Sequence, residues 1–129
     1  MINVLIVDDE EKICEFIKAF LDNEGYCTEV TYDGKSAIDK INSKKYDLII
    51  LDRMLPYVSG EEICKYIRSK SEVPIIMLTA RIEDEDKISK ILYLLNSLPL
   101  NNSKAEFVDE DYTIEIKGEN TYIIYMKEN

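Results

Sequence analysis

The stretch LIILDRMLP, residues 48–56, decides the fold. Four apolar residues lead directly into Asp52, and Pro56 follows four residues later. An unbroken run of leucine and isoleucine is typical of a strand that is buried on both faces of a parallel sheet. Burying a carboxylate at the end of such a strand costs free energy unless the charge has a partner. The stretch therefore predicts a buried strand that ends at a functional edge.

Other segments repeat this pattern, with helical stripes between them. The predicted strands are residues 2–7, 26–31, 47–51 and 73–78. Apolar residues three and four positions apart predict helices around Ile13, Phe16, Ile17, Phe20 and Leu21, around Ala37, Ile38 and Ile41, and around Ile63, Cys64 and Ile67. Strands that alternate with helices predict an α/β fold, a doubly wound parallel sheet with helices on both faces.

Local signals indicate where the helices begin and end. Gly25 ends the first helix. Asp33 is a capping residue type, and Ser59 with Glu62 three residues later forms a capping-box pattern. Right-handed crossovers bring the carboxyl ends of all the strands to one edge of the sheet, where ligands bind in such folds.

Acidic and hydroxyl residues gather at this predicted edge. Asp8 and Asp9 follow the first strand, Asp52 follows the third and Thr79 follows the fourth. Two unit charges about 4 Å apart repel by on the order of 4 kcal/mol at an effective dielectric near 20, so such a cluster favours a bound cation. An oxygen-rich site suits Mg²⁺, and a carboxylate can act as a nucleophile to form an aspartyl phosphate. Thr79 would donate a hydrogen bond to a phosphoryl oxygen, and Ala80 is small enough to leave the anion room.

Three motifs in order resemble one family. VLIVDDEE (4–11), DLIILDRMLPYVSGEEICKYIR (47–68) and VPIIMLTAR (73–81) are similar to the response-regulator receiver domain of bacterial two-component systems. The similarity is greatest to receivers that precede a winged-helix DNA-binding domain, and it covers residues 1–88. The resemblance implies a flavodoxin-like fold, a Mg²⁺ cofactor and a histidine kinase as partner.

The resemblance also implies a role for each matching residue. Asp52 matches the phosphoacceptor. Asp9 and Asp52 match the direct Mg²⁺ ligands, with Asp8 nearby and often acting through water. The main-chain carbonyl of Met54 matches the third protein ligand, and Thr79 matches the switch hydroxyl. The loop that shapes the site is matched by Pro56 and Gly60.

Residues 89–129 depart from the family. The family's Lys-Pro dipeptide does not occur, and alignment by count places Asn101 or Asn102 at the lysine position and Leu98 near the aromatic switch position. Lys104 is the nearest candidate for the missing lysine. Lys87 and Lys90 are further candidates, and the alternative interpretation makes all three solvated surface lysines.

The C-terminal segment has its own pattern. Residues 112–116 and 122–126 alternate between apolar and polar side chains around KGEN (117–120), which predicts a β-hairpin after a helix. This atypical β-rich segment would complete or replace the family's last strand and helix. Either a hairpin strand or residues 105–108 could fill the fifth sheet position, within one chain or in a strand-swapped homodimer. The apolar run 88–100 is interpreted as core, with a partner surface as the alternative.

Composition excludes several classes of function. The 129 residues contain 16 basic and 26 acidic side chains, for a net charge of −10, which argues against nucleic-acid binding. The absence of histidine removes histidine general bases and histidine zinc sites. Cys14, Cys27 and Cys64 are interpreted as reduced packing residues. No apolar run is long enough to cross a bilayer, and the start lacks a basic leader, so we expect a cytoplasmic protein without membrane contact.

The sequence therefore predicts a phosphoacceptor signalling domain rather than an enzyme. It would take a phosphoryl group on Asp52 and signal by protein contact, because no output domain follows in this sequence. One alternative is a phosphorylation-independent pseudo-receiver that acts as a decoy or dimerisation partner, and another is a truncated form of a DNA-binding transcription regulator. A metal-dependent phosphatase with Asp8 as nucleophile is disfavoured, because DDEEK lacks paired acids with one intervening residue.

Overall fold

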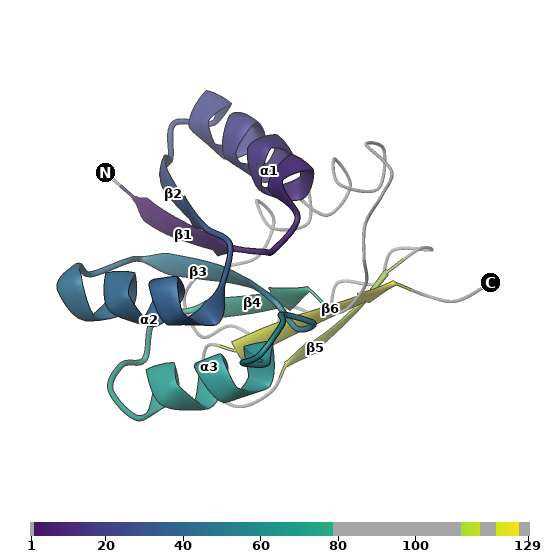
Figure 1. Ribbon diagram of the computed structural model, residues 1–129. Helices are drawn as coiled ribbons and strands as arrows, with labels where there is room; N and C mark the ends of the chain where they lie inside the picture. The colour runs from purple at the N-terminus through teal and green to yellow at the C-terminus, as the bar shows by residue number, and fades with distance from the viewer. Residues whose placement is uncertain (1, 79–111, 117–120, 127–129) are drawn as a thin grey trace.

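The computed structural model describes residues 2–78, 112–116 and 121–126. Within these ranges, strands and helices alternate from the N-terminus up to β4, and two strands follow in the C-terminal part (Figure 1). The elements in chain order are β1 (Asn3–Val7), α1 (Glu11–Asn23), β2 (Cys27–Thr31), α2 (Gly34–Ser43), β3 (Leu48–Asp52), α3 (Gly60–Arg68), β4 (Ile75–Leu78), β5 (Tyr112–Ile116) and β6 (Thr121–Met126).

The strands form one sheet in the order β2-β1-β3-β4-β6-β5. Neighbouring strands from β2 to β6 are parallel, and β5 pairs antiparallel with β6 at the edge. Helix α1 covers one face of the sheet, and α2 and α3 cover the other (Figure 1). The predicted doubly wound α/β fold is confirmed.

Two apolar layers enclose the sheet, because alternate residues of each strand point to opposite faces. Leu48 and Ile50 of β3 belong to the layer that includes the buried face of α1. Ile49 and Leu51 belong to the layer that includes α2 and α3. All four side chains are buried, which explains why the strand is continuously apolar. Each such side chain contributes about 1.5–3 kcal/mol relative to an exposed one.

The predicted helix boundaries are explained by specific contacts. The Asp33 carboxylate accepts a hydrogen bond from the Ser36 N–H at 2.8 Å and caps α2. The Ser59 hydroxyl accepts from the Glu62 N–H at 3.2 Å and caps α3. Gly25, just after α1, has φ +93, a left-handed conformation that glycine adopts with little strain.

Several strand boundaries differ by one or two residues from those expected, and the differences at β3 and β4 bear on the site. Asp52 is the last residue of β3 and does not follow the strand, so its backbone is held by the sheet. The strand predicted over residues 73–78 begins at Ile75. Pro74 has no N–H to donate to a strand ladder, although its carbonyl accepts a hydrogen bond from the Ile49 N–H at 3.0 Å.

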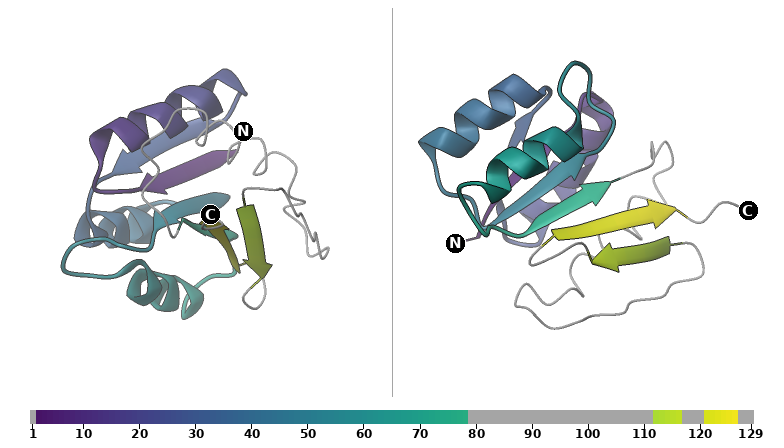
Figure 2. Two further views of the ribbon diagram at one scale, coloured as in Figure 1. Left: turned by 90° about the vertical axis from the view of Figure 1, so that its right-hand side faces the viewer. Right: turned by 90° about the horizontal axis from the view of Figure 1, so that it is seen from below.

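The predicted hairpin strands are present, and β6 fills the fifth position of the sheet within the same chain. It pairs parallel with β4, with Ile75 beside Thr121 and Leu78 beside Ile124. Figure 2 shows the two strands at one side of the sheet, with β6 next to β4 and β5 outermost. The other candidate for this position, residues 105–108, lies outside the described residues, as does the apolar run 88–100.

Two further features of the described ranges concern the cysteines and the possibility of a membrane-spanning helix. The cysteines are free thiols, with Cys14 buried and Cys27 and Cys64 half-buried. None of the helices in these ranges combines the length and the apolar character needed to cross a bilayer.

Candidate functional site

The sheet brings three carboxylates together at its carboxyl edge. Strands β1 and β3 pair parallel with Val7 beside Leu51. The next residues along the chain, Asp8 just after β1 and Asp52 at the end of β3, therefore lie at the same level. One carboxylate oxygen from each of Asp8, Asp9 and Asp52 lies within 4.8 Å of the other two. The three acids that the sequence assigned to one site are therefore neighbours in space.

Two of these carboxylates are buried and held by the backbone. Asp8 and Asp52 are only 6% and 8% exposed, and Asp9 is half-buried. The Asp8 Oδ1 accepts a hydrogen bond from the Glu10 N–H at 2.9 Å, and the Asp52 Oδ1 accepts from the Met54 N–H at 3.1 Å. In both cases an aspartate bonds the backbone two residues later, a turn that fixes the side-chain direction.

The electrostatics of the cluster favour positive charge. Burial raises the pKa of Asp8 to about 7, and the charges of Asp52 and Asp9 add to the effect, while the Glu10 N–H opposes it. Burial and the neighbouring Asp8 charge also raise the pKa of the Cys14 thiol to about 12. A site that penalises its own negative charge in this way is stabilised either by a proton or by a cation.

The donor set fits a hard divalent cation. All three side-chain donors are carboxylate oxygens, which Mg²⁺ prefers. Metal–oxygen distances of about 2.1 Å place opposite oxygens of an octahedral ion about 4.2 Å apart. The carboxylate oxygens of the three aspartates lie within 4.8 Å of one another, which is close to this span. Small side-chain rotations would therefore let all three bind one ion.

The loop after β3 is packed tightly against the site. A Cβ on Gly60 would lie 2.3 Å from the Asp52 carbonyl oxygen and 2.8 Å from the Arg53 Cα, closer than such atoms can approach. The Gly60 N–H instead donates to the Arg53 carbonyl at 3.1 Å. Leu55 is buried and anchors this loop, whereas the Met54 side chain is 64% exposed. Only glycine allows α3 to begin directly behind Asp52.

Several expected site residues lie outside the described residues. These are Thr79, Ala80, Lys87, Lys90 and Lys104, and the positions Leu98, Asn101 and Asn102. Strand β4 ends at Leu78, which pairs in register with Asp52.

The sequence did not predict two contacts and one backbone conformation near the site. The Cys14 thiol donates to the Asp8 carbonyl at 3.3 Å and joins α1 to the end of β1, a link that nothing in the sequence signals. Tyr57 adopts φ +68 and is fully exposed, which a helix or strand pattern cannot reveal. Arg53 pairs with Glu61, eight residues later, and the opposite charges on either side of the loop were the only signal of this pair.

Comparison with known proteins identifies the family. The family model of the response regulator receiver domain matches residues 4–93. Response regulator ArlR of Staphylococcus epidermidis is 47% identical over 93 residues, which cover 72% of this chain and 42% of that protein. ArlR of Staphylococcus aureus strain USA300 is 43% identical over the same length and with the same shares. The chain therefore spans less than half the length of these curated relatives.

Solved structures give the same result. Chemotaxis protein CheY4 of Vibrio cholerae matches with a TM-score of 0.65 and 29% identity, covering 75% of this chain and 98% of that chain. Response regulator TrrA of Thermotoga maritima, in complex with Mg(2+)-BeF, matches with a TM-score of 0.62 and 31% identity, covering 74% and 99%. The receiver domain of Francisella response regulator 1452 matches with a TM-score of 0.60 and 38% identity, covering 71% and 77%.

The family match extends over more than half of the chain, and the matched residues include the three clustered aspartates. The flavodoxin-like architecture of the described residues agrees with that of the CheY4 structure. This chain therefore belongs to the response regulator receiver domain family.

Proposed function

We propose that this chain accepts a phosphoryl group from a histidine kinase on Asp52, in a reaction that depends on Mg²⁺. The observation that carries the proposal is the cluster of three carboxylates at the carboxyl edge of the sheet. Family membership supports it, and so does the 31% identity to TrrA, whose structure contains Mg(2+)-BeF. The protein would act as a phosphoacceptor signalling domain and not as an enzyme with a separate substrate.

Asp52 would be the nucleophile. A carboxylate oxygen attacks the phosphorus of the donor phosphohistidine, and the new O–P bond forms as the N–P bond breaks. The electron pair of the N–P bond stays on the ring nitrogen, and an imidazole that already carries a proton on its other nitrogen leaves as the neutral ring. The backbone contact from the Met54 N–H fixes one oxygen of Asp52 and thereby limits the directions in which the carboxylate can point. Strand β3 lies between β1 and β4, so neighbours on both sides hold this residue in place.

Asp8, Asp9 and Asp52 would hold the Mg²⁺ ion together with the main-chain carbonyl of Met54. When bound, the ion neutralises the carboxylates and the developing charge on the phosphoryl oxygens. Asp8 must lose its proton to take part, and its pKa of about 7 places that step near neutral pH.

The signal would be passed on by residues of the fourth strand's edge. We assign the switch hydroxyl to Thr79 and the space for the phosphoryl group to Ala80, from the match of LTA to the family motif. Lys104 is a weak candidate for the family lysine. Residues 1–88 would form the receiver core, and residues 89–129 would complete or replace the family's last strand and helix and would support a homodimer.

The remaining expectations concern the binding partners and the location of the protein. With a net charge of −10, we expect output through protein contacts and no direct binding of nucleic acid by this chain. A histidine kinase is the proposed partner, the cytoplasm is the proposed location, and no contact with a membrane is expected.

The test is uptake of a phosphoryl group from a small donor. The protein is incubated with acetyl phosphate and Mg²⁺, and intact-protein mass spectrometry measures the modified fraction. We expect modification of the wild type and none of Asp52→Asn. Asp47→Asn is the matched control, because Asp47 is exposed just before the other end of the same strand and an asparagine can still accept the hydrogen bond from the Asn3 N–H.

A parallel measurement uses beryllium fluoride, a phosphoryl mimic, with Mg²⁺ and records chemical-shift changes by NMR. We expect saturable changes around Asp52 that disappear on chelation of Mg²⁺. A wild type that takes up neither ligand would contradict the proposal and favour the phosphorylation-independent interaction protein.

A further inference from the structure

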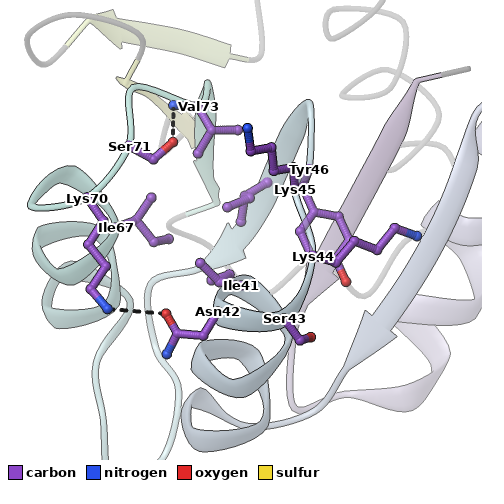
Figure 3. Close-up of a pocket in the computed structure, with 11 residues that line it drawn as sticks. Ile41, Asn42, Ser43, Lys44, Lys45, Tyr46, Ile67, Lys70, Ser71 and Val73 are labelled. Atoms are coloured by element: carbon purple, nitrogen blue, oxygen red, sulfur yellow. Dashed lines mark hydrogen bonds between the residues drawn. The ribbon is translucent and has the colours of Figure 1, made fainter.

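A pocket of about 620 Å³ lies at the other end of the strands from the three aspartates. Residues from the end of α2, the segment entering β3, the end of α3 and the segment entering β4 line it (Figure 3). Its volume falls within the range of about 300–1,000 Å³ that is usual for small-molecule sites. The pocket is therefore separate from the proposed phosphorylation site and shares only the strand β3 with it.

The interior of the pocket is apolar. Ile49 and Ile67 are buried core residues that reach its wall, and Ile41 and Val73 are half-buried. Ligand binding is favoured when the ligand covers the partly exposed apolar surface of Ile41 and Val73, because this removes that surface from water. This lining suits a ligand with an aliphatic or aromatic body.

The rim is basic although the whole chain carries a net charge of −10. Lys44, Lys45 and Lys70 line the pocket. Lys44 is neutralised by Glu29, since its Nζ lies 2.8 Å from the Glu29 Oε1. Within the described part of the chain, neither Lys45 nor Lys70 forms an ion pair with a carboxylate.

Lys70 is held in position by neutral groups. Its ammonium lies 2.7 Å from the Tyr66 hydroxyl and 3.3 Å from the Asn42 Oδ1, and 4.7 Å from the centre of the Tyr66 ring. Figure 3 shows Lys70 of the α3 side reaching towards Asn42 of the α2 side, across one end of the pocket. A fixed cation with no counter-ion beside an apolar wall is a suitable binding point for an anionic head group.

We propose that this pocket binds a small amphipathic organic anion, in which a carboxylate, sulfonate or phosphate head is joined to an apolar body. The head contacts Lys70, and the body covers Ile41 and Val73. The concave shape and the small number of lysines favour a free molecule over a bilayer surface, which requires a wider basic patch. The site is independent of phosphorylation at Asp52.

The test uses two free anions, 8-anilinonaphthalene-1-sulfonate and laurate, with the full chain. Fluorescence titration of the first and its displacement by the second measure affinity, and NMR shift mapping of the wild type locates the site. We expect saturable binding at one site, with shifts confined to residues 41–49 and 67–73. Shifts elsewhere, or no saturation, would overturn the proposal.

Charge variants test the role of Lys70. Reversal of this charge by Lys70→Glu removes a charge-assisted contact, so we expect binding at least about tenfold weaker. Lys65→Glu is the matched control, because Lys65 is exposed on the same helix α3 but does not line the pocket, and binding should change by less than about twofold. If the two variants lost the same amount of binding affinity, the effect would come from net charge alone, and the proposed role of Lys70 in the pocket would be contradicted.

Two further measurements keep the result decisive. Ile41→Gln removes apolar contact at a half-buried position and should weaken binding while the circular dichroism spectrum stays that of the wild type. Sedimentation with phosphatidylglycerol vesicles distinguishes the source of the anion. Binding to vesicles without binding to either free anion would overturn the proposal of a small-molecule ligand.

Discussion

Asp8 is buried beside two other carboxylates, and burial is the first reason that its pKa rises from 3.8 to about 7. Near pH 3 the group is protonated in both the folded and the unfolded protein. Between about pH 4 and pH 7 the unfolded chain loses this proton while the folded chain keeps it, so the free energy of unfolding falls as the pH rises. Above about pH 7, in the absence of a cation, Asp8 is charged in the folded protein too, and the full cost of its buried charge lowers the free energy of unfolding.

Asp8→Asn should remove this penalty while keeping an oxygen that accepts the Glu10 N–H. At pH 8 without Mg²⁺ we expect the variant to be more stable than the wild type by on the order of 2–3 kcal/mol. Urea denaturation followed by circular dichroism at pH 5 and pH 8, with Mg²⁺ and with a chelator, measures the effect. Mg²⁺ should stabilise the wild type more than the variant, and Asp47→Asn should behave as the wild type does. Parallel pH profiles of Asp8→Asn and the wild type would contradict this account.

Gly60 and Gly25 need to be glycine for different reasons, which gives a matched pair of substitutions. Gly60→Ala places a Cβ 2.3 Å from the Asp52 carbonyl oxygen, so the backbone beside the site must move. We expect a loss of about 2–3 kcal/mol in the free energy of unfolding and weaker Mg²⁺ binding.

Gly25→Ala meets no atom within 4 Å, and only its φ of +93 opposes the change. It should cost about 1 kcal/mol and leave Mg²⁺ affinity unchanged. Thermal denaturation and calorimetric titration with Mg²⁺ measure both quantities. Equal Mg²⁺ affinities for the two variants would show that Gly60 does not position Asp52.

At the scale of elements, α3 begins directly behind the loop that carries Asp52 and Met54. The Ser59 hydroxyl satisfies the Glu62 N–H at the first turn of this helix. Ser59→Ala should cost about 1 kcal/mol in the free energy of unfolding, whereas Ser59→Thr keeps the hydroxyl and should cost less. Denaturant unfolding of the two variants compares these costs, and an alanine variant as stable as the threonine variant would rule out a capping role.

At the same scale, the sequence predicted most of the elements correctly because their patterns are strong. The continuous run Leu48–Leu51 could only be satisfied by apolar layers on both faces of the sheet, and the structure has both layers. The caps at Asp33 and Ser59 were predicted from local chemistry, which depends on only a few neighbouring residues. The boundaries shifted where one backbone group decided them, as at Pro74.

The site was predictable only in part. Parallel strand order places Asp8 beside Asp52, so their meeting followed from topology. The contact between the Cys14 thiol and the Asp8 carbonyl depends on how α1 packs across the end of β1, and no spacing rule reports this. The pocket between α2 and α3 was not predicted either, because its lining comes from four separate segments whose side chains meet only after packing.

At the scale of the whole molecule, the hairpin of β5 and β6 covers the edge of β4 that would otherwise lack a strand partner. In a chain that ends at residue 111, the backbone N–H and C=O groups at the edge of β4 would be free to pair with a strand of another molecule. We expect a lower melting temperature and concentration-dependent self-association, measured by analytical ultracentrifugation. A chain that ends at residue 126 keeps both strands and is the control. A monomeric shorter chain of unchanged melting temperature would contradict this role of the hairpin.

The hairpin also sets an order of assembly. Strands β5 and β6 pair with each other across a short connection, whereas the pairing of β6 with β4 joins residues 75–78 to residues 121–124. Closing so long a loop costs chain entropy before the contacts repay it, so this step should come late in folding. In native-state hydrogen exchange we expect the amides of β6 to exchange through a partial opening of lower free energy than the opening that exposes β3. The strand that bears the reactive aspartate would then stay ordered while the outer margin of the sheet detaches and returns as one cooperative unit.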